Sequence, residues 1–164
     1  MPIATLTEVR QLCSSDYDAY LARVDELDAV HRDALPGIFR ARESGRPRTL
    51  EYFEALLADP NTLMIGAWVE AELAGYAHAI LREVEHLGIH VGRRYVLIDN
   101  FAVGPRWQRR GVGRALVDAV ADWAKQRGAT DLELEVWEVN AGAIRFYEEI
   151  GFEPQRRRLA RSLA

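Results

Sequence analysis

The sequence contains little cysteine, little lysine and no long apolar run. Of its 164 residues, Cys13 is the sole cysteine and Lys125 the sole lysine, so arginine supplies nearly all of the basic charge. A single cysteine excludes a disulfide within the chain and a zinc site built from several cysteines. No apolar stretch approaches the length of about twenty residues that a membrane span needs, and the first residues, MPIATLTEVR, lack the pattern of a secretory signal. We therefore expect a cytoplasmic protein that does not enter a membrane.

What the sequence does contain fits a single domain over residues 1–164. Hydrophobic residues make up 49% of the chain, which is enough to build a core in a domain of this length. The formal net charge is −4, yet basic residues gather in 106–114 and in the C-terminal tail. The negative total disfavours general binding of nucleic acid, whereas a local anion site is compatible with it.

Helical and strand periodicities alternate along the chain. Apolar residues at steps of three and four predict helices at 15–35, between Thr49 and Asp59, at 111–127 and, capped by Asn140, at 141–150. Runs rich in apolar and β-branched residues predict strands at 3–9, 62–69, 72–84, 95–103, 131–139 and within 152–163. The order β-α-α-β-β-β-α-β-α-β indicates a mixed α/β sheet with helices on its faces.

The segment QRRGVG, residues 108–113, lies between a predicted strand and a predicted helix. The first N–H groups of a helix have no partner within the helix and lie at the positive end of its dipole. Glycines let an anion approach the backbone closely, and neighbouring arginines add charge-assisted hydrogen bonds to it. The segment therefore predicts a phosphate site, with a glycine-rich turn carrying solvated arginines as the alternative.

Two common nucleotide-binding loops do not fit this segment. A Walker loop requires Gly-Lys-Ser/Thr, whereas Gly113 is followed by Arg114 and Ala115. A dinucleotide fingerprint requires a third glycine where this chain has Leu116. Hydrolysis of a nucleotide and binding of a dinucleotide are therefore disfavoured.

Two further segments complete a recognisable pattern, namely IDNFAVGPRW (98–107) and NAGAIRFYEEIGF (140–152). Together with QRRGVG they make the sequence resemble the GNAT superfamily of acetyl-CoA-dependent N-acetyltransferases, whose members carry Gln/Arg-x-x-Gly-x-Gly/Ala after the fourth strand. The motifs match over 95–153, and residues 1–94 agree only in the order of elements. The resemblance implies a mixed, mostly antiparallel central sheet with splayed central strands and helices on both faces.

The resemblance also implies acetyl-CoA as co-substrate and no metal. The backbone of Phe101, Ala102 and Val103 would pair with the pantetheine arm, much as an added strand pairs with a sheet edge. Asn140 resembles the family asparagine that contacts this arm, although a role as helix N-cap is equally open. The pyrophosphate would be held by the loop and first helical turn, that is by Gln108, Arg109, Arg110, Gly111, Val112, Gly113 and Arg114.

Acetyl transfer to a primary amine by direct attack in a ternary complex expels a thiolate. A thiol has a pKa of about 8.5 and a phenol one of about 10, so Tyr147 would be protonated at neutral pH and could act as general acid. Packing in the core is the alternative role for this tyrosine. As the base we favour Asp99, acting through water, because an acid within an apolar strand requires a reason. The other candidate bases are Glu83, Glu85, Glu133 and Glu135.

Two other functions stay open at this stage. The chain could be a catalytically silent acyl-CoA-binding sensor or scaffold, or a module that binds anions or nucleic acid through 106–114. The presence of Tyr147 and Asn140 beside a complete loop favours the enzyme over the sensor, and the net charge disfavours nucleic acid. No motif identifies the amine acceptor, which could be a small molecule or a peptide. Homodimers are common in the family.

Overall fold

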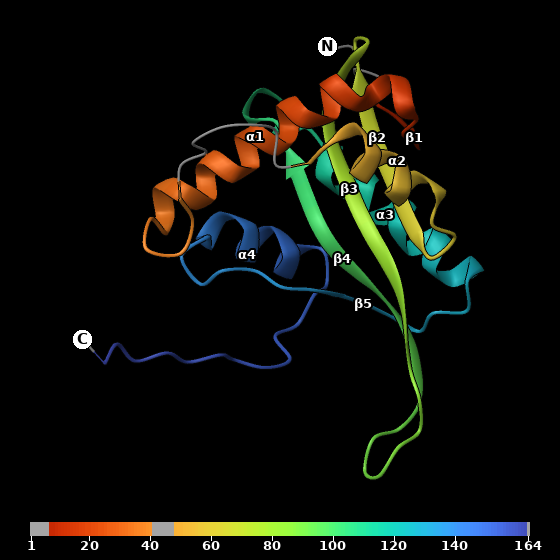
Figure 1. Cartoon of the computed structure of the whole chain (residues 1–164), viewed down its shortest axis with the longest axis vertical. Coiled ribbons are helices and arrows are strands. Elements are labelled where there is room, and N and C mark those ends of the chain that lie inside the picture. The colour runs from red at the N-terminus through yellow and green to blue at the C-terminus, as the bar shows by residue number, and fades with distance from the viewer. Residues whose placement is uncertain (1–6, 41–47, 164) are drawn as a thin grey trace.

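The computed structural model describes residues 7–40 and 48–163, in which helices cover both faces of a five-stranded sheet (Figure 1). Two single-turn 3-10 helices, Ser14–Asp16 and Pro105–Trp107, accompany the main elements. In chain order the main elements are β1 (Glu8–Gln11), α1 (Tyr17–Ala34), α2 (Leu50–Ala58), β2 (Thr62–Val69), β3 (Glu72–Val84), β4 (Arg93–Val103), α3 (Val112–Gln126), β5 (Asp131–Leu134) and α4 (Ala141–Glu149).

The strands lie in the order β1-β2-β3-β4-β5. Neighbours from β1 to β4 are antiparallel, and β5 runs parallel to β4. The prediction of a mixed, mostly antiparallel sheet is therefore confirmed. None of the helices in the described ranges is both long and apolar enough to span a bilayer.

Two hydrophobic clusters lie on opposite faces of the sheet. On one face, α3 contributes the fully buried Leu116 and Val120. On the other face, α1 and α2 cover an aromatic cluster in which the Tyr20 ring lies 4.7 Å from the Phe53 ring and 5.0 Å from the Tyr76 ring. Burying such large side chains supplies most of the driving force for folding, so these contacts fix how the helices lie on the sheet.

Local signals in the sequence set several boundaries correctly. The turn at Glu70-Ala71 joins β2 to β3, and both residues have positive φ angles, 51° and 65°, as tight hairpins require. Thr49 caps α2 by accepting a hydrogen bond from the backbone N–H of Tyr52 at 3.2 Å. Gly128 follows α3 with a φ of 71°, which ends that helix.

The predicted strands at both ends of the chain need correction. β1 occupies Glu8–Gln11 instead of 3–9, and residues 1–6 lie outside the described ranges. β5 ends at Leu134 instead of residue 139, and residues 152–163 form no strand. The tail arginines pair instead with acids that follow β5, with Arg156 lying 3.3 Å from Glu135. Strand-like alternation in the sequence was not enough there, because a strand also needs a partner edge.

A β-bulge in β4 explains why β5 is short. The register with β3 pairs His78 with Asn100 but Ala79 with Ile98, so Asp99 is an extra residue in β4. A bulge bends its strand and increases the local twist. β5 pairs with β4 only as far as Ile98. The two strands therefore separate at Asp99, and the prediction of splayed central strands is confirmed.

The bulge also reverses which side chains of β4 enter the core. Before it, Val96 and Ile98 pack into the cluster beneath α3, and after it Phe101 and Val103 do so. Side chains alternate along a regular strand, so one extra residue is needed to change from even to odd positions. Asp99 occupies the point of change, where its side chain is 41% exposed.

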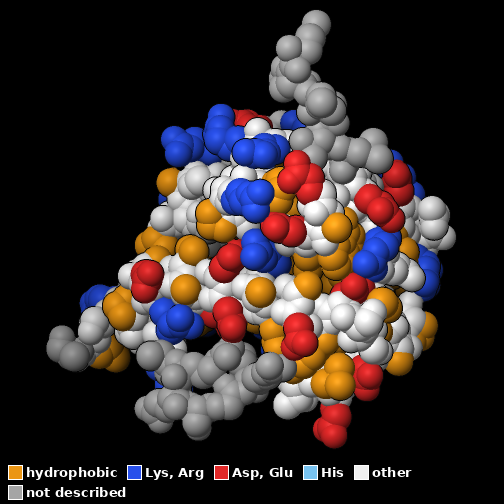
Figure 2. All heavy atoms as spheres, turned by 90° about the horizontal axis from the view of Figure 1, so that it is seen from above, with side chains coloured by type: hydrophobic (Ala, Val, Ile, Leu, Met, Phe, Trp, Pro, Cys, Tyr) orange, Lys and Arg blue, Asp and Glu red, His pale blue; other side chains and the backbone are white. Residues whose placement is uncertain are grey.

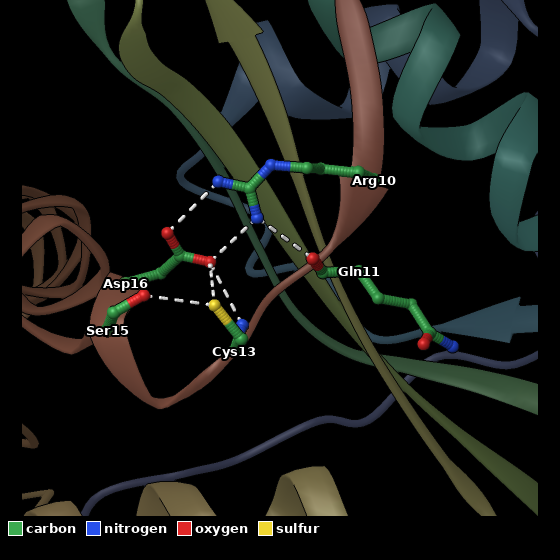
Figure 3. A network of polar contacts seen from close by, with 5 residues as sticks. All are labelled: Arg10, Gln11, Cys13, Ser15 and Asp16. Atoms are coloured by element: carbon green, nitrogen blue, oxygen red, sulfur yellow. Dashed lines mark hydrogen bonds and ion pairs between the residues drawn. The ribbon is translucent and has the colours of Figure 1, made fainter.

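Arg10 and Asp16 connect β1 to the start of α1 (Figure 3). The Arg10 guanidinium donates to both carboxylate oxygens of Asp16, at 2.8 and 3.1 Å. The backbone N–H of Cys13 donates to the same carboxylate at 2.9 Å, and the Cys13 thiol lies 3.3 Å from it. These bonds, that of Arg10 above all, lower the pKa of Asp16 to about 2 although the side chain is buried.

We predict that Asp16→Asn lowers the free energy of unfolding at neutral pH by about 2 kcal/mol, the equivalent of its pKa shift. A carboxyl whose pKa falls on folding stabilises the protein above its unfolded pKa of about 3.9 and stops doing so as pH falls through the folded value. The free energy of unfolding, measured with urea, should therefore decrease more for the wild type than for the variant as the pH falls from about 4 to about 2.

The matched control is Asp122→Asn, which removes an exposed carboxylate paired with Lys125 on α3. Exposed pairs contribute about 0–1 kcal/mol, so the control should stay near the wild type at every pH. Parallel pH dependence in the wild type and in Asp16→Asn would contradict the role given to this carboxylate.

Candidate functional site

A cavity of about 680 Å³ opens where β4 and β5 separate. Its walls come from the end of β4, the loop before α3, the segment after β5, the length of α4 and one side of α1. The volume is within the range of about 300–1,000 Å³ that small-molecule and cofactor sites occupy. The bulge at Asp99 therefore creates a site large enough for an extended ligand.

One wall of the cavity is a free strand edge. On one side, the β4 residues from Asn100 to Val103 pair with β3, and on the other side β5 has already left at Ile98. Among the residues that the structure describes, no strand lies beside Phe101 and Ala102 on the cavity side. Gln108 Nε2 donates to the Val103 carbonyl at 3.2 Å and so closes the far end of this edge. A ligand lying between could pair with the strand as an added strand would.

The loop before α3 has the geometry of an anion site. Arg109 and Gly111 both adopt left-handed backbone conformations, with φ angles of 60° and 84°. Gly111 is the N-cap of α3, no side chain in the described part of the chain caps the helix, and Ala115 N–H already bonds to the Gly111 carbonyl. The N–H groups of the first turn are therefore available to a ligand at the positive end of the helix dipole.

Glycine at position 113 allows the first turn of α3 to approach α4. A Cβ atom at Gly113 would lie 2.9 Å from Cζ of Phe146, which is closer than ordinary van der Waals contact. Phe146 in turn stacks on Phe101 with ring centroids 6.0 Å apart. The loop, the strand edge and α4 therefore form one packed unit around the cavity.

Most of the residues predicted for the site line this cavity. Two do not present their side chains there: Val112 is buried in the core, and the Arg110 guanidinium lies 5.5 Å from the ring centroid of Trp107. Those that do are Asp99, Phe101, Ala102, Val103, Gln108, Arg109, Gly111, Gly113, Arg114, Asn140 and Tyr147.

The structure also adds residues that the sequence analysis missed. Arg145 on α4 lines the cavity, and its charge beside Tyr147 was a usable signal. His31 on α1 and Trp137 after β5 line it as well. These last two come from segments without a motif, and only the tertiary packing brings them to the site.

Tyr147 lies in an aromatic environment on α4. Its ring lies 6.1 Å from Phe101, 5.2 Å from Phe146 and 5.6 Å from Phe152, centroid to centroid. Burial raises the pKa of Tyr147 to about 12. Within the described ranges, no residue forms a hydrogen bond with its hydroxyl. The phenol is thus protonated at neutral pH and free to donate to a ligand in the cavity.

Asn140 is the N-cap of α4, as one of the two readings of the sequence predicted. Its side-chain oxygen accepts a hydrogen bond from the backbone N–H of Ala143 at 3.1 Å. The cap uses only the oxygen, so the Nδ2 group at the cavity wall can still donate to a ligand. Capping and ligand contact are therefore compatible roles for the same residue.

Asp99 differs from the other candidate carboxylates in its surroundings. His78 Nδ1 lies 3.4 Å from Asp99 Oδ2, and Asn100 Nδ2 donates to that same oxygen at 2.8 Å. The His78 contact foremost, and the bond from Asn100 as well, lower the pKa of Asp99 against the opposing effect of burial. Asp99 is therefore ionised at neutral pH.

The remaining carboxylates fall into two groups. Glu83 and Glu133 form ion pairs with arginines at the start of β4, and neither they nor Glu85 belong to the cavity wall. Glu135 does line the cavity, where it also pairs with Arg156. Among the residues that the structure describes, no three His, Cys, Asp or Glu side chains come together as a metal site would require.

Charged side chains of both signs lie on the surface and in the cavity. Seen from above, the surface shows basic and acidic side chains interspersed with hydrophobic ones (Figure 2). Within the cavity, Arg109, Arg114 and Arg145 contribute positive charge, whereas Glu26, Asp99, Glu135 and Glu149 contribute negative charge. The site thus presents charge of both signs to a ligand.

Known acetyltransferases match part of the chain. A segment of 53 residues is 49% identical to the ribosomal protein bS18-alanine N-acetyltransferase of Escherichia coli K12 and covers 32% of this chain and 36% of that enzyme. A segment of 96 residues is 35% identical to the streptothricin acetyltransferase of Streptomyces lavendulae and covers 58% of this chain and 46% of that enzyme. The matches thus span less than half of either relative.

Solved structures resemble this fold over nearly the whole chain. A tetramutant of a Bacillus halodurans protein has a TM-score of 0.90 at 22% identity, covering 95% of this chain and 99% of that one. An aminoglycoside N-acetyltransferase in complex with CoA has a TM-score of 0.71 at 16% identity, covering 100% and 99%. At such low sequence identities, these matches show a shared fold alone.

A model of one protein family matches most of the chain. The model described as the acetyltransferase (GNAT) family matches residues 25–152, which include all three sequence motifs and every wall of the cavity. The fold and the matched relatives agree with this assignment. The chain therefore belongs to the acetyltransferase (GNAT) family.

Proposed function

We propose that the protein transfers an acetyl group from acetyl-CoA to a primary amine by direct attack in a ternary complex. The observation that carries this proposal is the convergence of three features on one cavity: a free strand edge, an uncapped helix N-terminus and a protonated phenol. The first two suit an extended ligand that ends in phosphates, and the third suits a thiolate leaving group.

Acetyl-CoA would lie along the cavity with its pyrophosphate at α3. The N–H groups of the first helical turn would receive the phosphate oxygens, and Arg109 and Arg114 would balance their charge. The pantetheine arm would pair with the cavity-facing backbone groups of Phe101, Ala102 and Val103, and Asn140 Nδ2 would donate to it. This arrangement would place the thioester near Tyr147, at the end of the strand edge away from the phosphates.

Tyr147 would act on the leaving sulfur. As the new C–N bond forms and the C–S bond breaks, the sulfur gains charge that the phenol can stabilise by donating a hydrogen bond. Complete proton transfer from a phenol of pKa about 12 to a thiolate of pKa about 8.5 is uphill by about 5 kcal/mol. The donated hydrogen bond is therefore the main contribution, and solvent supplies the proton that CoA finally carries.

The acceptor must lose a proton before it can attack. An ammonium with a pKa of about 10.4 transfers a proton to an ordinary Asp, pKa about 3.9, at a cost of about 9 kcal/mol. Release of the same proton to solvent at pH 7 costs about 5 kcal/mol. Asp99 would therefore hold the ammonium and an ordered water through which the proton reaches solvent. The rate should consequently rise with pH until the amine is neutral.

The acids in the cavity favour a cationic amine as acceptor. Glu26, Asp99 and Glu135 provide negative charge in the cavity, and His31 and Trp137 provide aromatic surface. By their names, the two relatives act on an alanine of a ribosomal protein and on streptothricin. We propose an amine of a peptide or of a small molecule for this chain. A cytoplasmic location and a homodimer stay predictions.

The test of this function is thiol release from acetyl-CoA in the presence of a panel of amines. We predict that Tyr147→Phe lowers kcat by about a hundredfold, in the range for loss of a general acid, with little change in the affinity for acetyl-CoA. Phenylalanine keeps the aromatic contacts of the ring, so the fold should persist. Because the pKa of Tyr147 is about 12, the wild-type rate should not decrease through loss of this proton at any pH up to about 10.

The matched control is Tyr52→Phe, which changes a half-exposed tyrosine of α2 away from the cavity and should keep full activity. An unimpaired chemical step in Tyr147→Phe would reject its proposed role. Tight binding of CoA without turnover of any amine would instead point to a silent sensor of acyl-CoA.

We further predict that Arg114→Ala weakens the binding of CoA by roughly tenfold, because truncating a charge-assisted hydrogen bond costs about 1.5–3 kcal/mol. Titration calorimetry at low and high salt would measure this effect, and the difference from the wild type should shrink as salt screens the phosphates. Arg158→Ala, in the exposed tail, is the control and should bind CoA normally. Equal affinities for both variants would exclude Arg114 from the phosphate site.

A further inference from the structure

The carboxylate of Asp99 is oriented from two sides. On β3, His78 places Nδ1 3.4 Å from Asp99 Oδ2, and the next residue of β4, Asn100, donates from Nδ2 to the same oxygen at 2.8 Å. Arg48, just before α2, donates in turn to Asn100 Oδ1 at 3.3 Å. The carboxylate thus belongs to a chain of contacts that begins beneath α1 and ends at the bulge.

Both contacts engage one oxygen of Asp99 and leave the other for a ligand. Oδ2 receives His78 and Asn100, whereas Oδ1 accepts no hydrogen bond from any residue in the described ranges. Asp99 itself lines the cavity, but His78 does not. The arrangement separates an oxygen that anchors the side chain from an oxygen that can bind the acceptor amine or its water.

The Nδ1 atom of His78 is a donor toward Asp99. The residue is 3% exposed, and its Nε2 atom is buried with no hydrogen-bond partner among the residues that the structure describes. An ionised carboxylate can only accept hydrogen bonds, so the Nδ1 atom that faces Asp99 carries a proton and points a donor at it.

The bulge makes such a support necessary. Because Asp99 is the extra residue of β4, it has no cross-strand partner of its own, unlike Asn100, which pairs with His78. A side chain that is 41% exposed at such a position can adopt several rotamers unless a neighbour fixes it. At 3.4 Å the His78 contact is long for a hydrogen bond, and together with the 2.8 Å bond from Asn100 it restrains the carboxylate on one side only.

We propose that His78 is a positioning residue for acetyl transfer, whose Nδ1–H holds Asp99 Oδ2 so that Oδ1 faces the acceptor amine and its water. The inference rests on the proposed function, in which Asp99 handles the proton of the amine. His78 touches no substrate and acts only through Asp99. Its removal should therefore affect the proton-transfer step and spare the binding of acetyl-CoA.

Other charged or titratable groups surround this pair and must be considered in any pH measurement. From the α1 and α2 side they are Tyr20, Arg48 and Asp59, and Tyr76 lies on β3. Glu135 and Tyr147 face the same cavity from the other side. His78 is the largest influence that lowers the pKa of Asp99, so its loss should raise that pKa.

The test uses two variants that are nearly equal in shape, His78→Leu and His78→Asn. Both lose the ring and its packing, but the Asn side chain keeps an N–H donor near the position of Nδ1. We expect His78→Leu to lower kcat roughly tenfold, because a freed Asp99 holds the ammonium and its water less well, and to leave the rise of the rate with pH unchanged, because the amine sets it. KM for acetyl-CoA should not change, and His78→Asn should recover most of kcat.

A double-mutant cycle with Asp99→Asn distinguishes positioning from a general effect on the fold. His78→Leu should cause no further loss in the Asp99→Asn background, since His78 acts through that carboxylate. Equal losses of kcat in His78→Leu and His78→Asn would overturn the proposal. A further loss of kcat when His78→Leu is added to Asp99→Asn would overturn it as well. So would wild-type kinetics in Asp99→Asn. Should His78→Leu not fold, His78→Gln keeps a buried amide but moves it away from the Nδ1 position, and a similar loss is expected.

A titration of the Asp99 carboxyl by NMR, which needs no turnover, keeps this inference separate from the proposed function. The pKa of Asp99 should be higher in His78→Leu than in the wild type and should return toward the wild-type value in His78→Asn. An unchanged pKa in His78→Leu would show that the two side chains are not coupled. Absence of turnover in the wild type would count against the function alone.

Discussion

The extra residue in β4 is the constraint on which the site depends. Without the bulge at Asp99, β5 could continue beside β4 past Ile98, and the strand edge would be closed by a neighbour. With it, the two strands diverge, and beyond Asn100 no strand of the described ranges pairs with the backbone on the cavity side. An unpaired strand edge is normally a liability, and here the walls of the cavity protect it from other chains.

The same region carries a second deviation from regular backbone. Arg109 occupies a left-handed conformation that costs a residue with a Cβ about 1 kcal/mol or more, and Gly111 occupies another at no such cost. Gly113 then brings α3 against Phe146 of α4. The strained loop is held by packing on both sides, which fixes the N–H groups of the helix before any ligand arrives. Such preorganisation reduces the ordering cost of binding.

Features set by a few neighbouring residues could be predicted from the sequence, whereas features set across strands could not. The hairpin at Glu70-Ala71 and the end of α3 at Gly128 were correct because their backbone angles depend on local chemistry. The end of β5 was wrong because the bulge in another strand decides it. The pairing of His78 with Asp99 had no sequence signal at all, since it depends on the register between β3 and β4.

The environments of the two proposed catalytic groups shift their pKa values in opposite directions, and this has a consequence for how the rate is controlled. Burial raises the pKa of Tyr147, and hydrogen bonding, foremost from His78, lowers that of Asp99. Each group therefore keeps one protonation state over the physiological range: one is always a donor and the other always an anion. Under the proposed mechanism, the group that titrates in that range is the acceptor amine, so the pH at which the reaction becomes fast belongs to the substrate more than to the enzyme.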